Sequence, residues 1–108
     1  MLSKEKLEDL ARMFKALSHP HRLAMFLKLA NCCAKGGDWV DPEESSMAVG
    51  DLGVGLNISP STLSHHIKEL RDSGLVKVEA AGQVRLCCVE ARTLARLSGF
   101  FESVFPKK

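Results

Sequence analysis

Residues 59–76 of the chain read SPSTLSHHIKELRDSGLV. Local chemistry predicts a short helix here, because Ser59 is a favourable N-cap and Pro60 suits the first helical position. Gly74 lies just past the expected end, where glycine commonly terminates a helix. The apolar side chains of this helix are expected on one face: Leu63, Ile67 and Leu70.

The opposite face of this helix carries short hydrogen-bonding groups in place of the usual Glu, Lys and Gln: Ser61, Ser64, His65 and Lys68. Short donors allow a helix to approach base edges and phosphates closely in the major groove of DNA. The helix N-terminus also favours anions. We interpret residues 59–73 as a recognition helix; the alternative is a surface helix that happens to be rich in Ser and His.

The flanking segments complete a winged helix-turn-helix. Val49, Leu52 and Leu56 indicate a short helix that several glycines weaken, and Asn57-Ile58 indicates a tight turn. After the recognition helix, the strand-like runs LVKVEA and VRLCCV, joined through Ala81-Gly82, predict a β-hairpin. Two short helices around a tight turn, followed by a hairpin, form this fold.

The second predicted helix runs from Ser18 to about Ala34. Ser18 is expected to cap it, and Leu23, Phe26, Leu27, Ala30 and Cys33 are expected to be buried. His19 and His21 are possible ligands, but beside Pro20 we interpret them as shaping the start of the helix. His66, at the border of the buried stripe of the recognition helix, is interpreted as a packing or hydrogen-bonding residue.

The first and last helices, about 3–17 and 91–105, both carry wide apolar stripes. Together these stripes hold more apolar side chains than one small core is expected to bury: Leu7, Leu10, Phe14, Leu97, Phe101 and Phe105. Some of them should therefore contact a partner. A homodimer would cover them, and its two-fold axis would set two recognition helices about 34 Å apart on a palindrome. The alternative is that both helices close over their own core.

Length and composition fit one globular domain. The chain has 108 residues, of which 45% are hydrophobic and 26% charged. We predict a single α+β, mainly α domain over 1–108, with the helix-turn-helix at about 49–73 and the wing at about 75–89. No apolar run reaches membrane-spanning length and the start lacks a signal-peptide pattern, so we expect a cytoplasmic protein without membrane contact.

Charge is distributed unevenly along the chain. The net charge is only +2, so binding to nucleic acid must come from a local surface. Residues 38–51 hold five acids and no Lys or Arg, so this stretch should face away from phosphates. The loop within it, 36–46, is either a lid over an inducer site or a tolerated surface insertion.

The stretches LSHPHRLAMFLKL (17–29) and VGDLGVGLNISPSTLSHHIKELRDSGLVKVE (49–79) resemble the ArsR/SmtB family of metal- and stress-responsive repressors. The resemblance covers nearly the whole chain. It implies a winged-helix homodimer that represses transcription until a ligand releases it from double-stranded DNA. It also implies the DNA-facing positions Ser61, Thr62, Ser64, His65 and Lys68.

The chain departs from the family pattern in three places. The wing reads Ala80-Ala81-Gly82-Gln83 where family wings are often basic, which leaves Lys77 and Arg85 as its charges and implies a weaker phosphate contribution. Ala48-Val49-Gly50 replaces the family's Cys-Val-Cys signature. The last helix has no His or Asp, so the family's His and acid zinc site is also absent there.

Four cysteines remain as a tentative metal site: Cys32, Cys33, Cys87 and Cys88. Thiolates select soft ions, so arsenite, antimonite or another soft metal ion is a possible inducer, and no cofactor is required. Neighbours on a regular strand point to opposite faces, so Cys87 and Cys88 cannot both chelate one ion. Two alternatives stay open: buried apolar residues without function, and thiols that sense oxidation or persulfide.

Two other classes of function were compared with the repressor. A winged helix that binds protein would favour aromatic and Met side chains on its exposed face over Ser and His. A thiol hydrolase would need a cleft and an orienting partner for a Cys–His pair, so we predict that the chain is not an enzyme.

Overall fold

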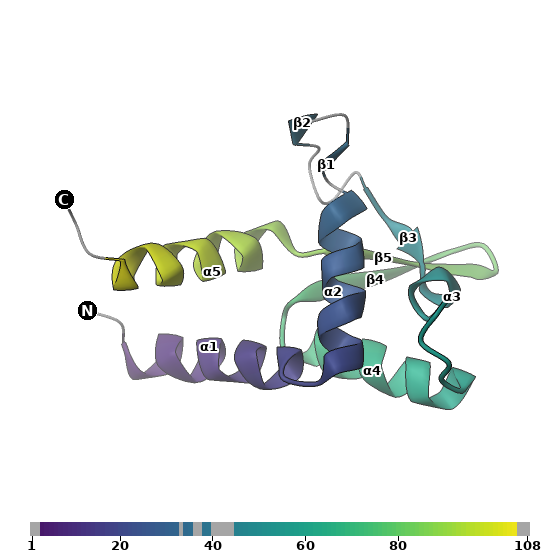
Figure 1. Cartoon of the computed structure of the whole chain (residues 1–108), viewed down its shortest axis with the longest axis horizontal. Coiled ribbons are helices and arrows are strands. Elements are labelled where there is room, and N and C mark those ends of the chain that lie inside the picture. Colours follow the sequence, from purple (N-terminus) through teal and green to yellow (C-terminus); the bar gives the residue numbers. More distant parts are fainter. Residues whose placement is uncertain (1–2, 33, 36–37, 40–44, 106–108) are drawn as a thin grey trace.

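The computed structural model describes residues 3–32, 34–35, 38–39 and 45–105. Over these residues the chain forms five helices: α1 (Lys4–Leu17), α2 (Pro20–Cys32), α3 (Val49–Leu52), α4 (Pro60–Asp72) and α5 (Ala91–Val104). In Figure 1, α1 and α5 extend toward one end of the molecule and α2 stands across its middle. The N-terminal end of α4 and the loop of the hairpin lie at the opposite end.

The described strands form two antiparallel sheets. A small one pairs β1 (Ala34–Lys35) with β2 (Asp38–Trp39). The other has the order β3-β5-β4, with the bounds Met47–Ala48 for β3, Val76–Ala81 for β4 and Val84–Val89 for β5. Met47 lies opposite Cys87, so β3 pairs with the second hairpin strand. The predicted fold class, mainly helical with a β-hairpin wing, is confirmed.

The core lies where α2, α4 and the base of the hairpin meet. Its fully buried side chains come from α2, α3, α4, β5 and the residue before β4: Met25, Leu29, Leu52, Ile67, Leu70, Leu75, Cys87 and Val89. None of the described helices is both long enough and apolar enough to cross a membrane.

The prediction for the buried face of α2 was right for Phe26, which is 7% exposed, but wrong for Leu23 and Leu27. Leu23 and Leu27 are 43% and 52% exposed, whereas Met25 and Leu29 are fully buried. The buried stripe is thus rotated by about one residue, or about 100° around the helix. The reason is tertiary: α2 contacts α1, α4 and β5, and these contacts select its face. The helix ends at Cys32, and Cys33 lies outside the described residues.

The predicted cap of α2 was also wrong. Ser18 ends α1 instead, because both its backbone N–H (3.2 Å) and its hydroxyl (2.6 Å) donate to the Lys15 carbonyl. The side chain that caps the start of α2 is His19, whose Nδ1 accepts from the His21 backbone N–H at 3.1 Å.

The third helix is shorter than predicted and ends at Leu52. Gly55 (φ 87°) and Asn57 (φ 55°) have left-handed backbone conformations that no helix contains, so the segment from 53 to 59 is the turn. Of the predicted loop 36–46, residues 36–37 and 40–44 lie outside the described part of the chain.

Candidate nucleic-acid interface

The start of α4 is fixed by its own side chains. The Ser59 hydroxyl accepts from the Thr62 backbone N–H at 3.1 Å, and Pro60 occupies the first turn. The same hydroxyl lies 2.9 Å from Thr62 Oγ1, to which it donates, and 3.1 Å from Ser61 Oγ. The predicted N-cap is therefore confirmed, and the hydroxyls of Ser61 and Thr62 take part in it.

The inner face of α4 sets its orientation. Ile67 and Leu70 are 1% and 0% exposed, as predicted. Leu63 packs against the turn so closely that a Cβ added at Gly53 would lie 3.0 Å from its Cδ2 atom. Because these three side chains hold α4 against the rest of the fold, the opposite face of the helix must point outward.

That opposite face is exposed to solvent. It contains all five predicted contact residues of the helix: Ser61, Thr62, Ser64, His65 and Lys68. No described residue forms a side-chain hydrogen bond or ion pair with Ser64 or Lys68, whereas Ser61 and Thr62 bond within the cap. The polar groups of Ser64 and Lys68 therefore face solvent without a partner among the described residues.

The end of α4 is joined to the wing and to α5 through Leu75. The Leu75 N–H donates to the Leu70 carbonyl of α4 at 3.1 Å, and its own carbonyl accepts from the Glu90 N–H at 3.0 Å. The Thr93 hydroxyl of α5 donates to the Gly74 carbonyl. Gly74 has a φ of 83°, so the predicted helix terminator is confirmed.

The two predicted basic residues of the wing occupy different places. Lys77 lies at the base of the hairpin, where its Nζ is 3.9 Å from Glu90 Oε2. Arg85 is exposed and pairs with Ala80, nearer the tip. The tip itself is Gly82-Gln83, since Ala81 pairs with Val84, one residue beyond the predicted connection.

The cysteines differ in their surroundings. Cys87 is fully buried. Burial is the main cause, and the neighbouring Cys88 the second, that raises the pKa of its thiol to about 12. Cys88 and Cys32 are half-buried, and Cys87 and Cys88 face opposite sides of the strand, as predicted.

Sequence reasoning treated His19, His21 and His66 separately, but the structure brings them together. In the described residues they form the one group of three side chains that could hold a metal ion, and it contains no cysteine. The short spacing of His19 and His21 was a signal for such a group. Their meeting with His66, 45 positions beyond His21, depends on how α2 packs against α4.

Comparison with known proteins decides the family. The family model described as "Helix-turn-helix domain" matches residues 17–79. YceK, an HTH-type transcriptional regulator of Bacillus subtilis, is 30% identical over 95 residues, covering 87% of this chain and 84% of YceK. The chain belongs to the helix-turn-helix transcriptional regulators. Members of this family are DNA-binding regulators and not enzymes, in agreement with the prediction.

Solved structures show the same winged fold. An ArsR family transcriptional regulator, RHA00566, has a TM-score of 0.69 at 22% identity and covers 88% of this chain and 90% of its own. The homodimeric winged helix-turn-helix DNA-binding domain of Mb0332 from Mycobacterium bovis, a possible ArsR-family regulator, has a TM-score of 0.65 at 24% identity, covering 95% and 86%. The predicted resemblance to the ArsR/SmtB family is confirmed at the level of the fold.

Proposed function

We propose that this regulator is a homodimeric repressor that inserts α4 into the major groove of a palindromic operator. The observation that carries the proposal is the outward face of α4, where Ser64, His65 and Lys68 are exposed while Ile67 and Leu70 hold the helix from behind. Bases are read by such donors, and phosphates are bound by lysine. The cytoplasm is the proposed location, because a transcriptional regulator acts where its DNA is.

The wing plays a smaller part in this proposal. Arg85 is the exposed cation near its tip, while Lys77 is already close to Glu90. We therefore assign the phosphate contact of the wing mainly to Arg85. The Ser- and His-rich face of α4 also favours DNA over a protein partner, since protein interfaces favour aromatic and Met side chains.

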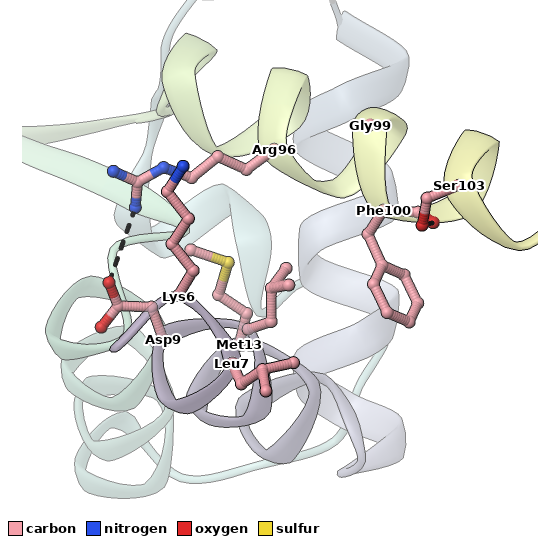
Figure 2. Close-up of a pocket in the computed structure, with 9 residues that line it drawn as sticks. Lys6, Leu7, Asp9, Met13, Arg96, Gly99, Phe100 and Ser103 are labelled. Carbon is pink, nitrogen blue, oxygen red and sulfur yellow. Dashed lines mark hydrogen bonds and ion pairs between the residues drawn. The ribbon is translucent and has the colours of Figure 1, made fainter. Parts of the chain in front are cut away.

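The dimer is proposed from the surface between α1 and α5. A pocket of about 790 Å³ lies between these helices, and Figure 2 shows Leu7, Met13 and Phe100 around it. Arg96 of α5 lies 4.0 Å from Asp9 of α1 at one side. Large apolar side chains remain exposed on the same two helices and on the residue that follows α5: Leu7 (51%), Phe101 (49%), Val104 (62%) and Phe105 (69%).

A second copy of the chain is the occupant that we propose for this surface. Full burial of an exposed side chain of this kind contributes about 1.5–3 kcal/mol, so each of these half- to two-thirds-exposed side chains would contribute roughly half of that, and the two-fold axis doubles the sum that works against the cost of association. The Mycobacterium bovis domain with this fold is described as homodimeric, which supports the assignment.

Binding of duplex DNA from upstream of the protein's own gene, measured by fluorescence anisotropy, tests the function. Ser64→Ala and His65→Ala are each expected to cost about 1–3 kcal/mol, or roughly 5- to 150-fold in Kd. Ser46→Ala, an exposed serine outside α4, is the matched control and should bind like the wild type. Unchanged affinity in both α4 variants, with thermal unfolding also unchanged, would refute the assignment of α4.

Lys68 is expected to bind phosphate and therefore to act on all sequences alike. Lys68→Ala should weaken specific and nonspecific DNA binding equally and reduce the slope of log K against log salt by about 1. Lys4→Ala removes the same charge at the far end of the molecule and should leave the slope unchanged. A loss confined to one sequence would contradict the phosphate role.

Release by a soft metal ion is the second part of the proposal. The tentative thiol ligands are Cys32, Cys33, Cys87 and Cys88, and arsenite or antimonite is the proposed inducer class. Cys32 and Cys88 are the described thiols that solvent reaches, so Cys32→Ser and Cys88→Ser should reduce release. Oxidant or persulfide in place of the ion tests the redox alternative. An operator complex that survives all of these reagents would exclude thiol sensing.

A further inference from the structure

Three of the chain's four histidines lie close together where the start of α2 packs against α4. The centroid of the His19 ring lies 4.5 Å from that of His66 and 5.2 Å from that of His21. The centroids of the His21 and His66 rings are 5.7 Å apart. Each ring offers one nitrogen, and these three atoms all lie within 4.8 Å of one another. We call these three residues the histidine cluster.

Two nitrogens of the cluster are buried without a partner among the described residues. They are His21 Nδ1 and His66 Nε2, and the whole His66 residue is only 4% exposed. A buried polar nitrogen that loses its hydration without gaining a hydrogen bond is unfavourable, and such atoms in folded proteins usually have an explanation. Two such nitrogens within one group of three imidazole side chains point to a ligand.

The cluster favours neutral imidazoles, which is the form that binds metal ions. Burial lowers the pKa of His66, and the neighbouring His19, Arg22, His21 and His65 lower it further. Burial also lowers the pKa of His19, again with Arg22 and His21 adding to the effect.

We propose that His19, His21 and His66 bind a zinc-type divalent ion, with water in the fourth position. Imidazole suits zinc, copper and nickel, and three histidines with one open position is an established zinc geometry. His19 would use Nε2, because its Nδ1 already accepts from the His21 backbone. Zn–N bonds of about 2.0–2.1 Å require the nitrogens to come closer than they are here, so small ring rotations would complete the site.

Arg22 lies beside the proposed site, and its contact with His66 must change before a metal ion can bind. Its Nη1 lies 3.3 Å from His66 Nδ1, while its Nε donates to the Ala16 carbonyl at 2.6 Å. An ion on His66 Nε2 leaves the proton on Nδ1, so two donors would face each other. Metal binding must therefore turn the guanidinium away from His66, which moves the contact that joins Arg22 to α4.

The site would also affect DNA binding, because it ties α4 to the start of α2. His66 is followed by the buried Ile67 and preceded by His65 on the exposed face. A metal ion here would restrict the helix that carries the predicted base contacts. This consequence rests on the proposed function, whereas metal binding itself does not.

Titration of the purified, metal-free chain with Co²⁺ tests the site without DNA. We expect one Co²⁺ per chain, with visible d–d absorption and no near-ultraviolet thiolate-to-cobalt charge-transfer band. His19→Gln should weaken binding by more than about 100-fold, since even the loss of an outer-shell partner costs up to about 100-fold. His65→Gln, an exposed neighbour outside the cluster, is the control and should bind normally.

The outcomes that would overturn the site are distinct from failure of the repressor proposal. Absence of saturable binding, or a thiolate band that His19→Gln leaves unchanged, would refute it. Because His66→Gln changes a buried residue, the half-buried His19 and His21 carry the test, and circular dichroism checks that their variants fold. Retained binding in both His19→Gln and His21→Gln would also refute it.

Discussion

Gly74 shows how one residue fixes the end of α4. Its φ of 83° lies in the left-handed region, and no neighbouring atom lies within 4 Å of an added Cβ. Gly74→Ala is therefore expected to destabilise the protein by about 1–2 kcal/mol through backbone strain alone. Chemical denaturation followed by circular dichroism measures this loss.

Gly50 is the matched control for that substitution. It lies in α3 with an ordinary backbone conformation and equally open space around its Cα. Gly50→Ala should be neutral or stabilise by up to about 1 kcal/mol, because alanine favours the helix. Equal losses in both variants would show that the left-handed angle at Gly74 is not responsible, because Gly→Ala at an ordinary backbone angle does not destabilise.

Single residues could be predicted where their chemistry is local. Ser59, Pro60 and Gly74 act on atoms a few positions away, so the bounds of α4 followed from the sequence. Ser18 failed for a local reason as well: a hydroxyl between two helices can end the first or begin the second. His19, with its own acceptor nitrogen, took the second role.

At the scale of elements, the clarity of the apolar pattern decided what could be predicted. The helix α4 alternates buried and polar faces, so its outward residues were assigned correctly as exposed. The middle of α2, LAMFLKLA, is apolar on nearly every side, so periodicity alone could not select its buried face. The histidine cluster was missed for a related reason, since only the packing of α2 on α4 creates it.

The histidine cluster predicts how stability depends on pH. The pKa of His66 is lowered from 6.5 in the folded chain, so the unfolded chain binds protons more readily. The free energy of unfolding should therefore be steady above pH 6.5 and fall as the pH drops from 6.5 toward the lowered pKa. Urea denaturation in the presence of a chelator measures it.

Two variants identify the source of this pH dependence. His19→Gln removes one titrating ring and its charge beside His66 and Arg22, so the fall should become shallower. His65→Gln leaves the cluster intact and removes only the smallest of the neighbouring charges that lower the pKa of His66, so its profile should stay closer to the wild type than that of His19→Gln. If His19→Gln falls as steeply as the wild type, other groups dominate the acid response.

At the scale of the whole molecule, the exposed apolar surface predicts the oligomeric state. Light scattering after size exclusion should give about twice the chain mass of 11.8 kDa. Leu7→Glu and Phe101→Glu place charge in the proposed interface and should give monomers with weaker operator binding. Val84→Glu changes a residue that is 48% exposed on the wing and should remain dimeric. A wild-type monomer at micromolar concentration would contradict the dimer.

The hydrogen bonds at Leu75 have a mechanical consequence for such a dimer. Leu75 links the end of α4 to Glu90, the N-cap residue of α5, and the bond from Thr93 to Gly74 adds a second link beside it. If α5 tilted at the two-fold axis, these hydrogen bonds would make α4 move with it. The distance between the two α4 helices of the dimer would then change. The affinity for operators whose half-sites are one base pair further apart would then depend on the tilt of α5. The residues that are proposed to contact the bases would stay the same.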